Sequence, residues 1–340
     1  MEKNIHILDT TLRDGSYAVA TPFSAEDTAR ICQGLDEAGI EFIEIGNGAG
    51  LNAQKLGWAK SAATDEEYMK AAKNVVRTAA YGFFCVPGIA RLEDVDLAHR
   101  YGVGFLRMGV YPDRIATSKD FITRAKKYRM LVSVNLLKSY VLSPQEFASY
   151  AKLVESYGAD VLYIVDSAGG MFPKDVLSCF QAIRQVSQIA IGFHGHDNLG
   201  FAVANSIAVA DAGASFIDVS LQGLGRSAGN ATAEVLLFAL KKHGYEFGID
   251  VLKIMELGEL LVRPRLLYKG KEPLDVVAGY ADYAFFESSY LSLIIRVAQE
   301  KGLHPAFLMI EVCKKDKLRP LPQDQLEKIA DVIKEKGLRL

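Results

Sequence analysis

The chain has 340 residues, of which 50% are hydrophobic, and its 39 basic and 41 acidic residues give a formal net charge of −2. This length fits one large barrel with an accessory part or two medium domains, and the balanced charge excludes the basic surface of a nucleic-acid-binding protein. No apolar run is long enough to cross a bilayer, the first residues lack the apolar core of a secretion signal, and the four cysteines are scattered. We therefore expect a cytoplasmic protein that binds neither membrane nor nucleic acid.

Eight short strands are predicted in the first two thirds of the chain. They alternate with segments such as 24–38 and 144–157, whose apolar residues recur at helical spacing. Repeated strand–helix units require a parallel sheet, and eight of them predict an α/β fold of the (β/α)₈ or TIM barrel type. An open doubly wound sheet is the alternative, but no GxGxxG motif follows the first strand. The expected strands are residues 5–9, 42–45, 79–84, 105–109, 131–136, 161–166, 191–194 and 216–219.

After residue 229 the pattern changes to helices alone. The segment 263–273, with two prolines and several basic residues, is the expected connector to a helical C-terminal part. We therefore expect a TIM-barrel catalytic domain, residues 1–265, and a small helical C-terminal domain, residues 266–340. The helices expected in this part of the chain are residues 231–242, 251–261, 290–301 and 323–336.

Side chains that bind metals gather where the predicted strands end, which is where the active site of such a barrel is built. Asp14 follows the first strand, and His194 and His196 lie two residues apart at the end of the seventh. Both imidazoles are therefore able to point to the same side. Two imidazoles and a carboxylate form a facial set of ligands for a divalent metal. The structural alternatives are a surface His-x-His turn and an Asp-Gly turn.

Arg13 stands next to this candidate ligand, where a guanidinium stabilises negative charge that develops on an oxygen; a structural ion pair is the alternative. The glycine-rich stretch 223–230 is either a phosphate cradle or a close-packed loop that brings Asn230 to the metal centre. Glu44 ends the second predicted strand. Three further polar residues at predicted strand ends suit a structural role if taken one at a time: Asn135, Asp166 and Ser167.

Three motifs resemble those of the DRE-TIM metallolyases, each at a predicted strand end and in the same order. They are LDTTLRDG at 8–15, HGHDNLG at 194–200 and GLGRSAGN at 223–230. That superfamily includes isopropylmalate and homocitrate synthases, 3-hydroxy-3-methylglutaryl-CoA lyase and the 4-hydroxy-2-oxovalerate aldolases. The chain is most similar to the aldolases over nearly its whole length, for example at EIGNGAGL (44–51) and ESYGADVLYIVDSAG (155–169). The resemblance implies a lyase, specifically a class II pyruvate aldolase.

The resemblance also implies roles for the site residues. Asp14, His194 and His196 would bind Mn²⁺ or a similar divalent ion (Mg²⁺, Co²⁺ or Zn²⁺). Pyruvate would chelate this ion, which would act as a Lewis acid. Asn230 would lie at the metal or beside it, and Arg13 would stabilise the pyruvate enolate. The remaining substrate-binding assignments are Ser167, which would hold the carboxylate, Asn135, and Glu44, which would support the loop after the first strand.

The sequence departs from the aldolase family at three places. Tyr17 stands where those aldolases carry a catalytic histidine, two residues beyond the RDG run, and is our candidate catalytic residue for orienting the acceptor. Glu287 replaces a family tyrosine before the pair Ser288-Ser289, and residues 314–324 replace a glycine-rich ending. Family members pass their aldehyde to a partner acylating aldehyde dehydrogenase. These departures argue against that partner and for an aldehyde other than, or beyond, acetaldehyde.

Two other functions stay open at this point. One is a Claisen-type acyltransferase of the isopropylmalate synthase kind, which would condense an acyl-CoA with a 2-oxo acid and release a thiol. The other is a catalytically weakened paralogue that acts as a binding subunit, for which the loss of the histidine base is the only support. The expected substrates are small molecules, pyruvate and an aldehyde, and a homo-oligomer is compatible with the sequence.

Overall fold

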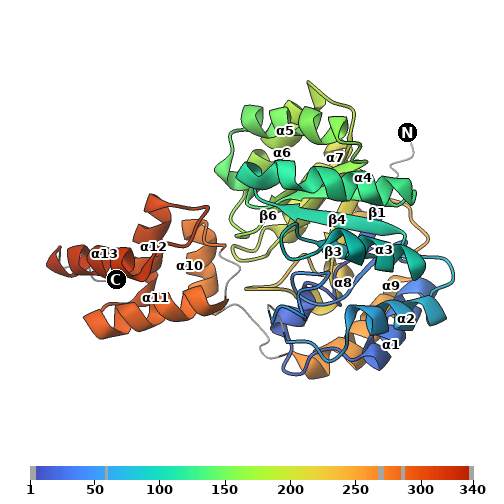
Figure 1. Cartoon of the computed structure of the whole chain (residues 1–340), viewed down its shortest axis with the longest axis horizontal. Coiled ribbons are helices and arrows are strands. Elements are labelled where there is room, and N and C mark those ends of the chain that lie inside the picture. The colour runs from blue at the N-terminus through green and yellow to red at the C-terminus, as the bar shows by residue number, and fades with distance from the viewer. Residues whose placement is uncertain (1–4, 58–59, 267–271, 285–287, 337–340) are drawn as a thin grey trace.

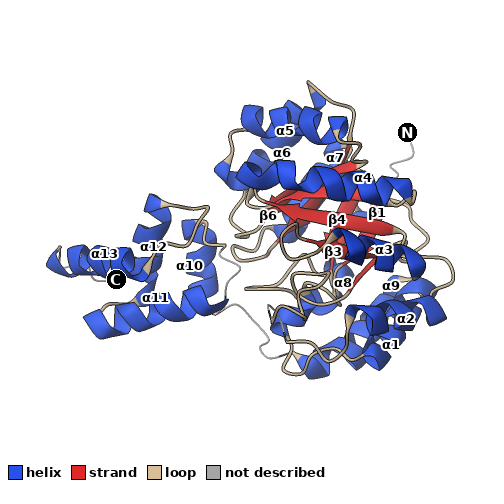
Figure 2. Ribbon diagram, in the orientation of Figure 1, coloured by secondary structure: helices blue, strands red, loops and turns tan. Residues whose placement is uncertain are grey.

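The computed structural model describes residues 5–57, 60–266, 272–284 and 288–336. Its centre is a closed barrel of eight strands that are neighbours in chain order, with every pair parallel and β8 returning to β1 (Figures 1 and 2). The predicted TIM barrel is therefore confirmed, and each strand ends within one residue of its expected bounds. The strands are β1 (His6–Asp9), β2 (Phe42–Ile45), β3 (Ala80–Cys85), β4 (Phe105–Val110), β5 (Leu131–Leu136), β6 (Val161–Asp166), β7 (Ala190–Gly195) and β8 (Phe216–Val219).

Helices follow the strands and cover the outside of the barrel, as Figure 2 shows. The first begins at a capping box: Ser24 Oγ accepts the Asp27 amide at 3.1 Å, and the Asp27 carboxylate accepts the Ser24 amide at 3.0 Å. Gly39, with a φ of +88°, supplies the left-handed residue after it. The barrel helices are α1 (Ala25–Glu37), α2 (Asp65–Val75), α3 (Leu92–Arg100), α4 (Lys119–Lys127), α5 (Pro144–Ser156), α6 (Pro173–Arg184), α7 (Ala202–Ala212) and α8 (Ala233–Lys242).

The chain after the barrel is helical, with three differences from the predicted segments, one of which is a helix at Pro273–Ala281 that was not predicted. The helix expected over 251–261 is α-helical only as α9 (Val251–Leu257) and continues as a π-helix, Gly258–Val262. The change falls at Gly258, where a Cβ atom would lie 2.3 Å from the Glu234 carboxylate. α12 (Pro305–Lys315) was not predicted, because its N-cap is the His304 ring rather than a Ser, Thr, Asp or Asn side chain. The other helices are α10 (Pro273–Ala281), α11 (Ser288–Lys301) and α13 (Gln323–Glu335).

These last helices have a hydrophobic core of their own. Ile294, Val312 and Leu326 are fully buried in it, and it is separate from the core that surrounds the barrel strands. A separate core is what a second domain requires. The boundary expected after residue 265 stays a prediction, since residues 267–271 lie outside the described part of the chain.

A buried lysine ties the helical region to the carboxyl end of the barrel. Lys138, in the loop after β5, is fully buried, and its Nζ donates to the carbonyl oxygens of Lys317 at 3.0 Å and Leu318 at 2.9 Å. Asn198, after β7, donates from Nδ2 to the carbonyl oxygen of Asp275 in α10 at 2.9 Å. The helical region therefore rests on the loops after β5 and β7, beside the barrel in Figure 1.

Among the described residues, no helix combines the length and the apolar character that crossing a membrane requires.

Candidate metal and substrate site

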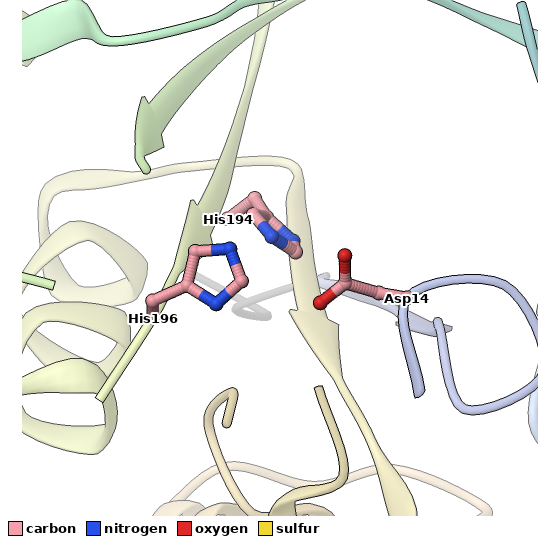
Figure 3. A group of neighbouring side chains, drawn as sticks. All are labelled: Asp14, His194 and His196. Carbon is pink, nitrogen blue, oxygen red and sulfur yellow. The ribbon is translucent and has the colours of Figure 1, made fainter. Parts of the chain in front are cut away.

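Three predicted metal ligands meet at the carboxyl end of the barrel. Asp14 lies in the loop after β1, His194 within β7 and His196 directly after it (Figure 3). All three side chains are buried, and each offers one ligand atom within 4.8 Å of the other two. The two imidazole rings stand almost perpendicular, at 88°, with their centres 5.1 Å apart. This arrangement is the facial set that the sequence predicts, and the surface-turn alternative is wrong because both histidines are buried.

The two imidazoles are oriented by hydrogen bonds at Nδ1. His194 Nδ1 lies 2.8 Å from Asp218 Oδ2, and His196 Nδ1 lies 3.2 Å from the carbonyl oxygen of Gly229. A carboxylate and a carbonyl only accept hydrogen bonds, so each Nδ1 carries the hydrogen and each Nε2 keeps its lone pair. Metal-binding histidines are fixed in the same way. The donor chemistry of the described residues therefore fits a divalent metal.

Asp14 is held as an anion by its neighbours. Arg13 Nη1 donates to Asp14 Oδ1 at 2.7 Å, and Asn230 Nδ2 donates to Asp14 Oδ2 at 2.9 Å. Although burial raises the pKa of this carboxyl, the adjacent Arg13 guanidinium holds it well below its usual range. Burial also lowers the pKa of His196 well below its ordinary value, which keeps that ring neutral. Asp14 and His196 are thus deprotonated at neutral pH, as metal binding requires.

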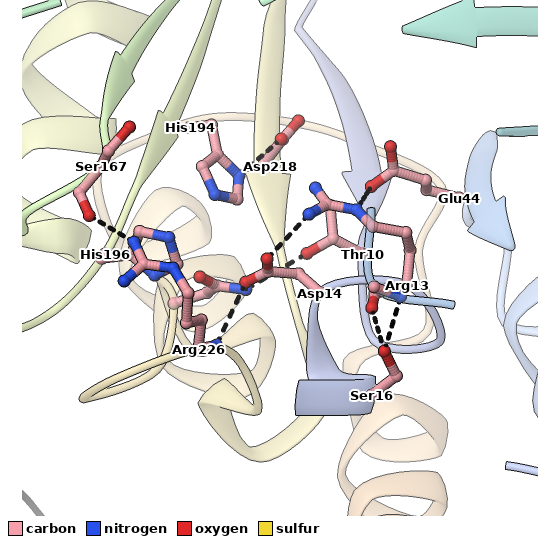
Figure 4. Close-up of polar contacts among 12 residues, drawn as sticks. Thr10, Arg13, Asp14, Ser16, Glu44, Ser167, His194, His196, Asp218 and Arg226 are labelled. Atoms are coloured by element: carbon pink, nitrogen blue, oxygen red, sulfur yellow. Dashed lines mark hydrogen bonds and ion pairs between the residues drawn. The ribbon is translucent and has the colours of Figure 1, made fainter. Parts of the chain in front are cut away.

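A chain of buried ion pairs runs from Asp14 across the inside of the barrel to His194. Arg13 Nε donates to Glu44 Oε2 at 2.8 Å (Figure 4). Arg107 donates from Nη1 to the same Glu44 oxygen at 3.0 Å and from Nη2 to Asp218 Oδ2, the atom that also binds His194. Three carboxylates face two guanidiniums along this chain, and the Arg226 guanidinium, beside Asp14 and His196, balances the third carboxylate.

Sequence reasoning missed Arg107 and Asp218, because it considered polar residues only at strand ends. Both lie inside strands: Arg107 interrupts FLRMGV in β4, and Asp218 interrupts FIDV in β8. A charged residue within a buried apolar strand needs a partner. That rule is the signal in the sequence that would have found them.

A cavity of about 510 Å³ opens over the ligands and has two chemically different halves. We call them the polar half and the apolar half. The apolar half also includes two polar residues, Arg114 and Thr117, and both are exposed to solvent. The polar half is lined by Arg13, Asp14, Tyr17, Asn135, Ser167, His194 and His196. The apolar half, at the ends of β3, β4 and β5, is lined by Phe84, Val86, Ile89, Val110, Phe121 and Leu137.

Two predicted site residues lie behind the cavity wall rather than in it. Glu44 is fully buried and reaches the cavity only through Arg13. Asn230 reaches the metal site through its hydrogen bond to Asp14. The glycine-rich loop makes this bond feasible, because a Cβ atom on Gly225 would lie 2.5 Å from the Asn230 amide. Of the two interpretations of residues 223–230, a phosphate cradle and a close-packed loop, this contact favours the close-packed loop. Glu287 lies outside the described residues.

Ser167 and Tyr17 occupy different sides of the polar half. Ser167 is buried at the end of β6, and its Oγ accepts the backbone amide of Lys138 at 3.0 Å. Tyr17 lies in a short 3₁₀ turn after β1 and is 36% exposed, with its side chain lining the cavity. Desolvation of the phenol raises the pKa of Tyr17 to about 12. The phenol is therefore neutral and serves as a hydrogen-bond donor at physiological pH.

Comparison with known proteins places this site in a family. A model of the HMGL-like family matches residues 4–261. The chain is 37% identical over 312 residues to a protein of Carboxydothermus hydrogenoformans named 4-hydroxy-2-oxovalerate aldolase, covering 92% of each chain. It is 39% identical to the protein of that name from Pelotomaculum thermopropionicum, covering 91% of this chain and 90% of the relative.

Solved structures with lower identity share the fold. The carboxyl transferase domain of Rhizobium etli pyruvate carboxylase, with pyruvate and biocytin, gives a TM-score of 0.78 at 17% identity over 99% of this chain and 61% of that one. The HMG-CoA lyase of Brucella melitensis gives a TM-score of 0.67 at 18% identity over 78% of this chain and 99% of that one. From the family model and the sequence relatives, the chain belongs to the HMGL-like family, among the 4-hydroxy-2-oxovalerate aldolases.

Proposed function

We propose that the protein is a divalent-metal-dependent class II pyruvate aldolase, which forms or cleaves a 4-hydroxy-2-oxo acid through a pyruvate enolate. The observation that carries this proposal is that three candidate metal ligands and a buried guanidinium lie side by side at one end of the cavity. Asp14, His194 and His196 offer three ligand atoms within 4.8 Å of one another, and Arg13 is hydrogen-bonded to Asp14 at 2.7 Å. The names of the sequence relatives support the same activity.

The proposed metal ligands are Asp14, His194 and His196, with Asn230 supporting Asp14. We propose Mn²⁺ as the ion, with Mg²⁺, Co²⁺ and Zn²⁺ as alternatives that the same nitrogen and oxygen donors accept. When bound, such an ion supplies Lewis-acid chemistry toward a keto oxygen. The ligand set leaves open positions, as a facial triad requires.

Arg13 is the proposed stabiliser of the enolate. Its Nε and Nη1 are held by Glu44 and Asp14, and it lines the cavity beside them. The Phe84 ring lies under the guanidinium, 4.4 Å from its central carbon. With its plane fixed from three sides, the guanidinium presents its remaining edge to an oxygen in the cavity and needs no reorganisation when negative charge develops there.

Ser167, Asn135 and Tyr17 are the proposed contacts with the rest of the substrate. Ser167 Oγ accepts from the Lys138 amide, so its own hydrogen is directed to another acceptor, for which we propose the pyruvate carboxylate. Asn135, beside it in the polar half, is the second proposed partner of that carboxylate. Tyr17 would donate its phenol hydrogen to the carbonyl oxygen of the acceptor aldehyde.

The apolar half is the proposed binding place of the acceptor. Binding sites for drug-sized molecules enclose roughly 300–1,000 Å³, and the cavity of about 510 Å³ lies within that range. Pyruvate and acetaldehyde together have far fewer atoms than such molecules. We therefore propose an uncharged aldehyde larger than acetaldehyde, with its carbon chain against Phe84, Val86 and Ile89.

Exchange of the pyruvate methyl hydrogens tests the reaction without knowledge of the acceptor. The protein is incubated with Mn²⁺ and pyruvate in deuterated buffer, and the methyl signal is followed by NMR. We expect deuterium incorporation that disappears when the metal is chelated and in Asp14→Asn. Absence of exchange with Mn²⁺, Mg²⁺, Co²⁺ and Zn²⁺ alike would refute the proposal.

Two further measurements address the alternatives and the partners. We expect no thiol release from acetyl-CoA and a 2-oxo acid, and metal-dependent release would favour the acyltransferase.

Association with an acylating aldehyde dehydrogenase and self-association both stay predictions that analytical ultracentrifugation tests. We expect self-association without a stable complex with that dehydrogenase.

A further inference from the structure

We propose that Arg107 is a positioning residue that fixes both the metal ligand His194 and the enolate-stabilising Arg13. This inference rests on the proposed function, and it concerns a residue that lies outside the cavity. Arg107 is 1% exposed, in the middle of β4, and within the described part of the chain it is hydrogen-bonded to two carboxylates, Glu44 and Asp218.

Arg107 shares one oxygen atom with each of the two groups that it positions. Glu44 Oε2 accepts from Arg13 Nε at 2.8 Å and from Arg107 Nη1 at 3.0 Å. Asp218 Oδ2 binds His194 Nδ1 at 2.8 Å and accepts from Arg107 Nη2. Arg107 therefore fixes the position of each carboxylate oxygen, and each oxygen in turn orients one functional group, Arg13 or His194.

Glu44 depends on these two bonds for its orientation. Its other oxygen, Oε1, is buried and accepts no hydrogen bond from the described residues. Without Arg107, Arg13 would be the remaining hydrogen-bond partner of this carboxylate among the described residues. The Glu44 carboxylate and the Arg13 guanidinium would then be able to shift together. The charge on Glu44 would also lose its fully buried counter-ion.

Stability alone is a weak reason for a buried guanidinium at this place. A buried ion pair gains little over apolar residues of the same volume, because desolvation offsets the attraction. Geometry gives a stronger reason. A guanidinium is a planar fork that reaches two carboxylates on β2 and β8 at fixed angles, and Tyr163 packs on its face with 4.6 Å from Cζ to the ring centre.

The consequence is that a single residue controls two separable properties. The path through Asp218 and His194 affects metal affinity, whereas the path through Glu44 and Arg13 affects enolate formation once the metal is bound. Loss of a residue that holds a metal ligand typically weakens binding about 10–100-fold. A purely structural residue would lower stability and leave both properties of the folded fraction unchanged.

The test uses Arg107→Lys and Arg107→Met in the full-length protein. Mn²⁺ affinity is measured by isothermal titration calorimetry on the metal-free protein, and pyruvate methyl exchange is measured at saturating Mn²⁺. We expect Mn²⁺ to bind about 10–100-fold more weakly in both variants and exchange to fall at least about tenfold, as for loss of a held charged group. Lysine should restore little, since a point charge does not reproduce the fork.

The matched control is Met108→Leu, the next residue of β4, which is fully buried and belongs to the hydrophobic core. We expect wild-type Mn²⁺ affinity and exchange from it. Arg107 variants that are folded by circular dichroism, but retain affinity and exchange within about twofold of wild type, would overturn the proposal. Absence of exchange in the wild type would instead remove the proposed function and leave the affinity measurement as the test of Arg107.

A second experiment decides the question even if the Arg107 variants do not fold. Glu44→Gln and Asp218→Asn are made singly and together, because no described residue other than Arg107 bonds to both side chains. If Arg107 couples them, the double variant departs by more than about threefold from the product of the single effects on exchange. Single effects that multiply within about twofold would show that the two paths are independent.

Discussion

The two halves of the cavity are built in different ways. In the polar half, the functional atoms are each held by a neighbour: His194 by Asp218, His196 by the Gly229 carbonyl, and Arg13 by two carboxylates. In the apolar half, Val86 and Ile89 line the space with hydrocarbon side chains, and the polar Arg114 and Thr117 are exposed to solvent. The difference indicates that one half fixes a reaction and the other accommodates a substrate. Substitutions of the proposed metal ligands and of Arg13 should therefore abolish the chemistry or greatly lower it, and those in the apolar half should change selectivity.

The largest effect is expected at the metal ligands. Asp14→Asn and His196→Ala should each abolish tight binding of about one divalent ion per chain, because a facial set of three has no ligand to spare. Elemental analysis of the purified proteins measures this. His243→Ala, a change at an exposed histidine paired with Asp211, is the control and should retain the metal. Undiminished metal in both site variants would contradict the assignment.

The next effect concerns Arg13. Arg13→Ala should lower pyruvate methyl exchange by about 10² or more while the metal is retained, because a fixed donor at the developing oxyanion is lost. Arg13→Lys should recover little of that rate, since an ammonium cannot hold Glu44 and Asp14 at once. Exchange is measured by NMR at saturating Mn²⁺. Wild-type exchange in Arg13→Ala would rule out this role.

A smaller effect is expected in the apolar half. Val86→Phe fills part of the acceptor space and should lower kcat/KM for hexanal about tenfold relative to acetaldehyde, the discrimination typical of a crowded hydrophobic pocket. Pyruvate exchange should stay unchanged, because no group of the polar half is altered. Val235→Phe, the same change on the exposed face of α8, is the control. An unchanged ratio between the two aldehydes would place the acceptor elsewhere.

The last prediction concerns Tyr17, which lines the polar half. Its pKa of about 12 makes the phenol a donor rather than a base, so Tyr17→Phe should keep exchange within about tenfold of wild type. The pH profile of exchange between pH 6 and 10 should not change, since Tyr17 does not ionise there. Tyr17→His should raise cleavage of simple 4-hydroxy-2-oxo acids. If Tyr17→Phe loses both exchange and cleavage with metal still bound, the tyrosine is the base.

The barrel and the proposed metal ligands were predictable because each depends on a local pattern. Strands buried on both faces appear as short apolar runs, and the barrel rule directs attention to the residues that follow them. Asp14 and the two histidines of β7 were found in this way. The capping box at Ser24 is local as well, since its two partners are three residues apart.

The rest of the site depends on contacts that no local pattern contains. Arg107 pairs with Glu44 across 63 residues of sequence and with Asp218 across 111. The close packing that brings Asn230 to Asp14 likewise joins loops at opposite ends of the barrel sequence. These pairings follow from the closed barrel, which brings the interior positions of β2, β4 and β8 together. They became visible only with the three-dimensional arrangement.

The burial of Lys138 limits the C-terminal regions with which this barrel can be combined. Its ammonium group is satisfied by the carbonyl oxygens of Lys317 and Leu318, while its backbone amide binds Ser167 in the cavity wall. A barrel recombined with another C-terminal region would keep the cation and lose both carbonyl partners. A recombined protein would therefore need a new residue at position 138, and that replacement would act directly on the neighbour of Ser167. The helical region is thus coupled through Lys138 to the wall of the cavity rather than attached as an independent module.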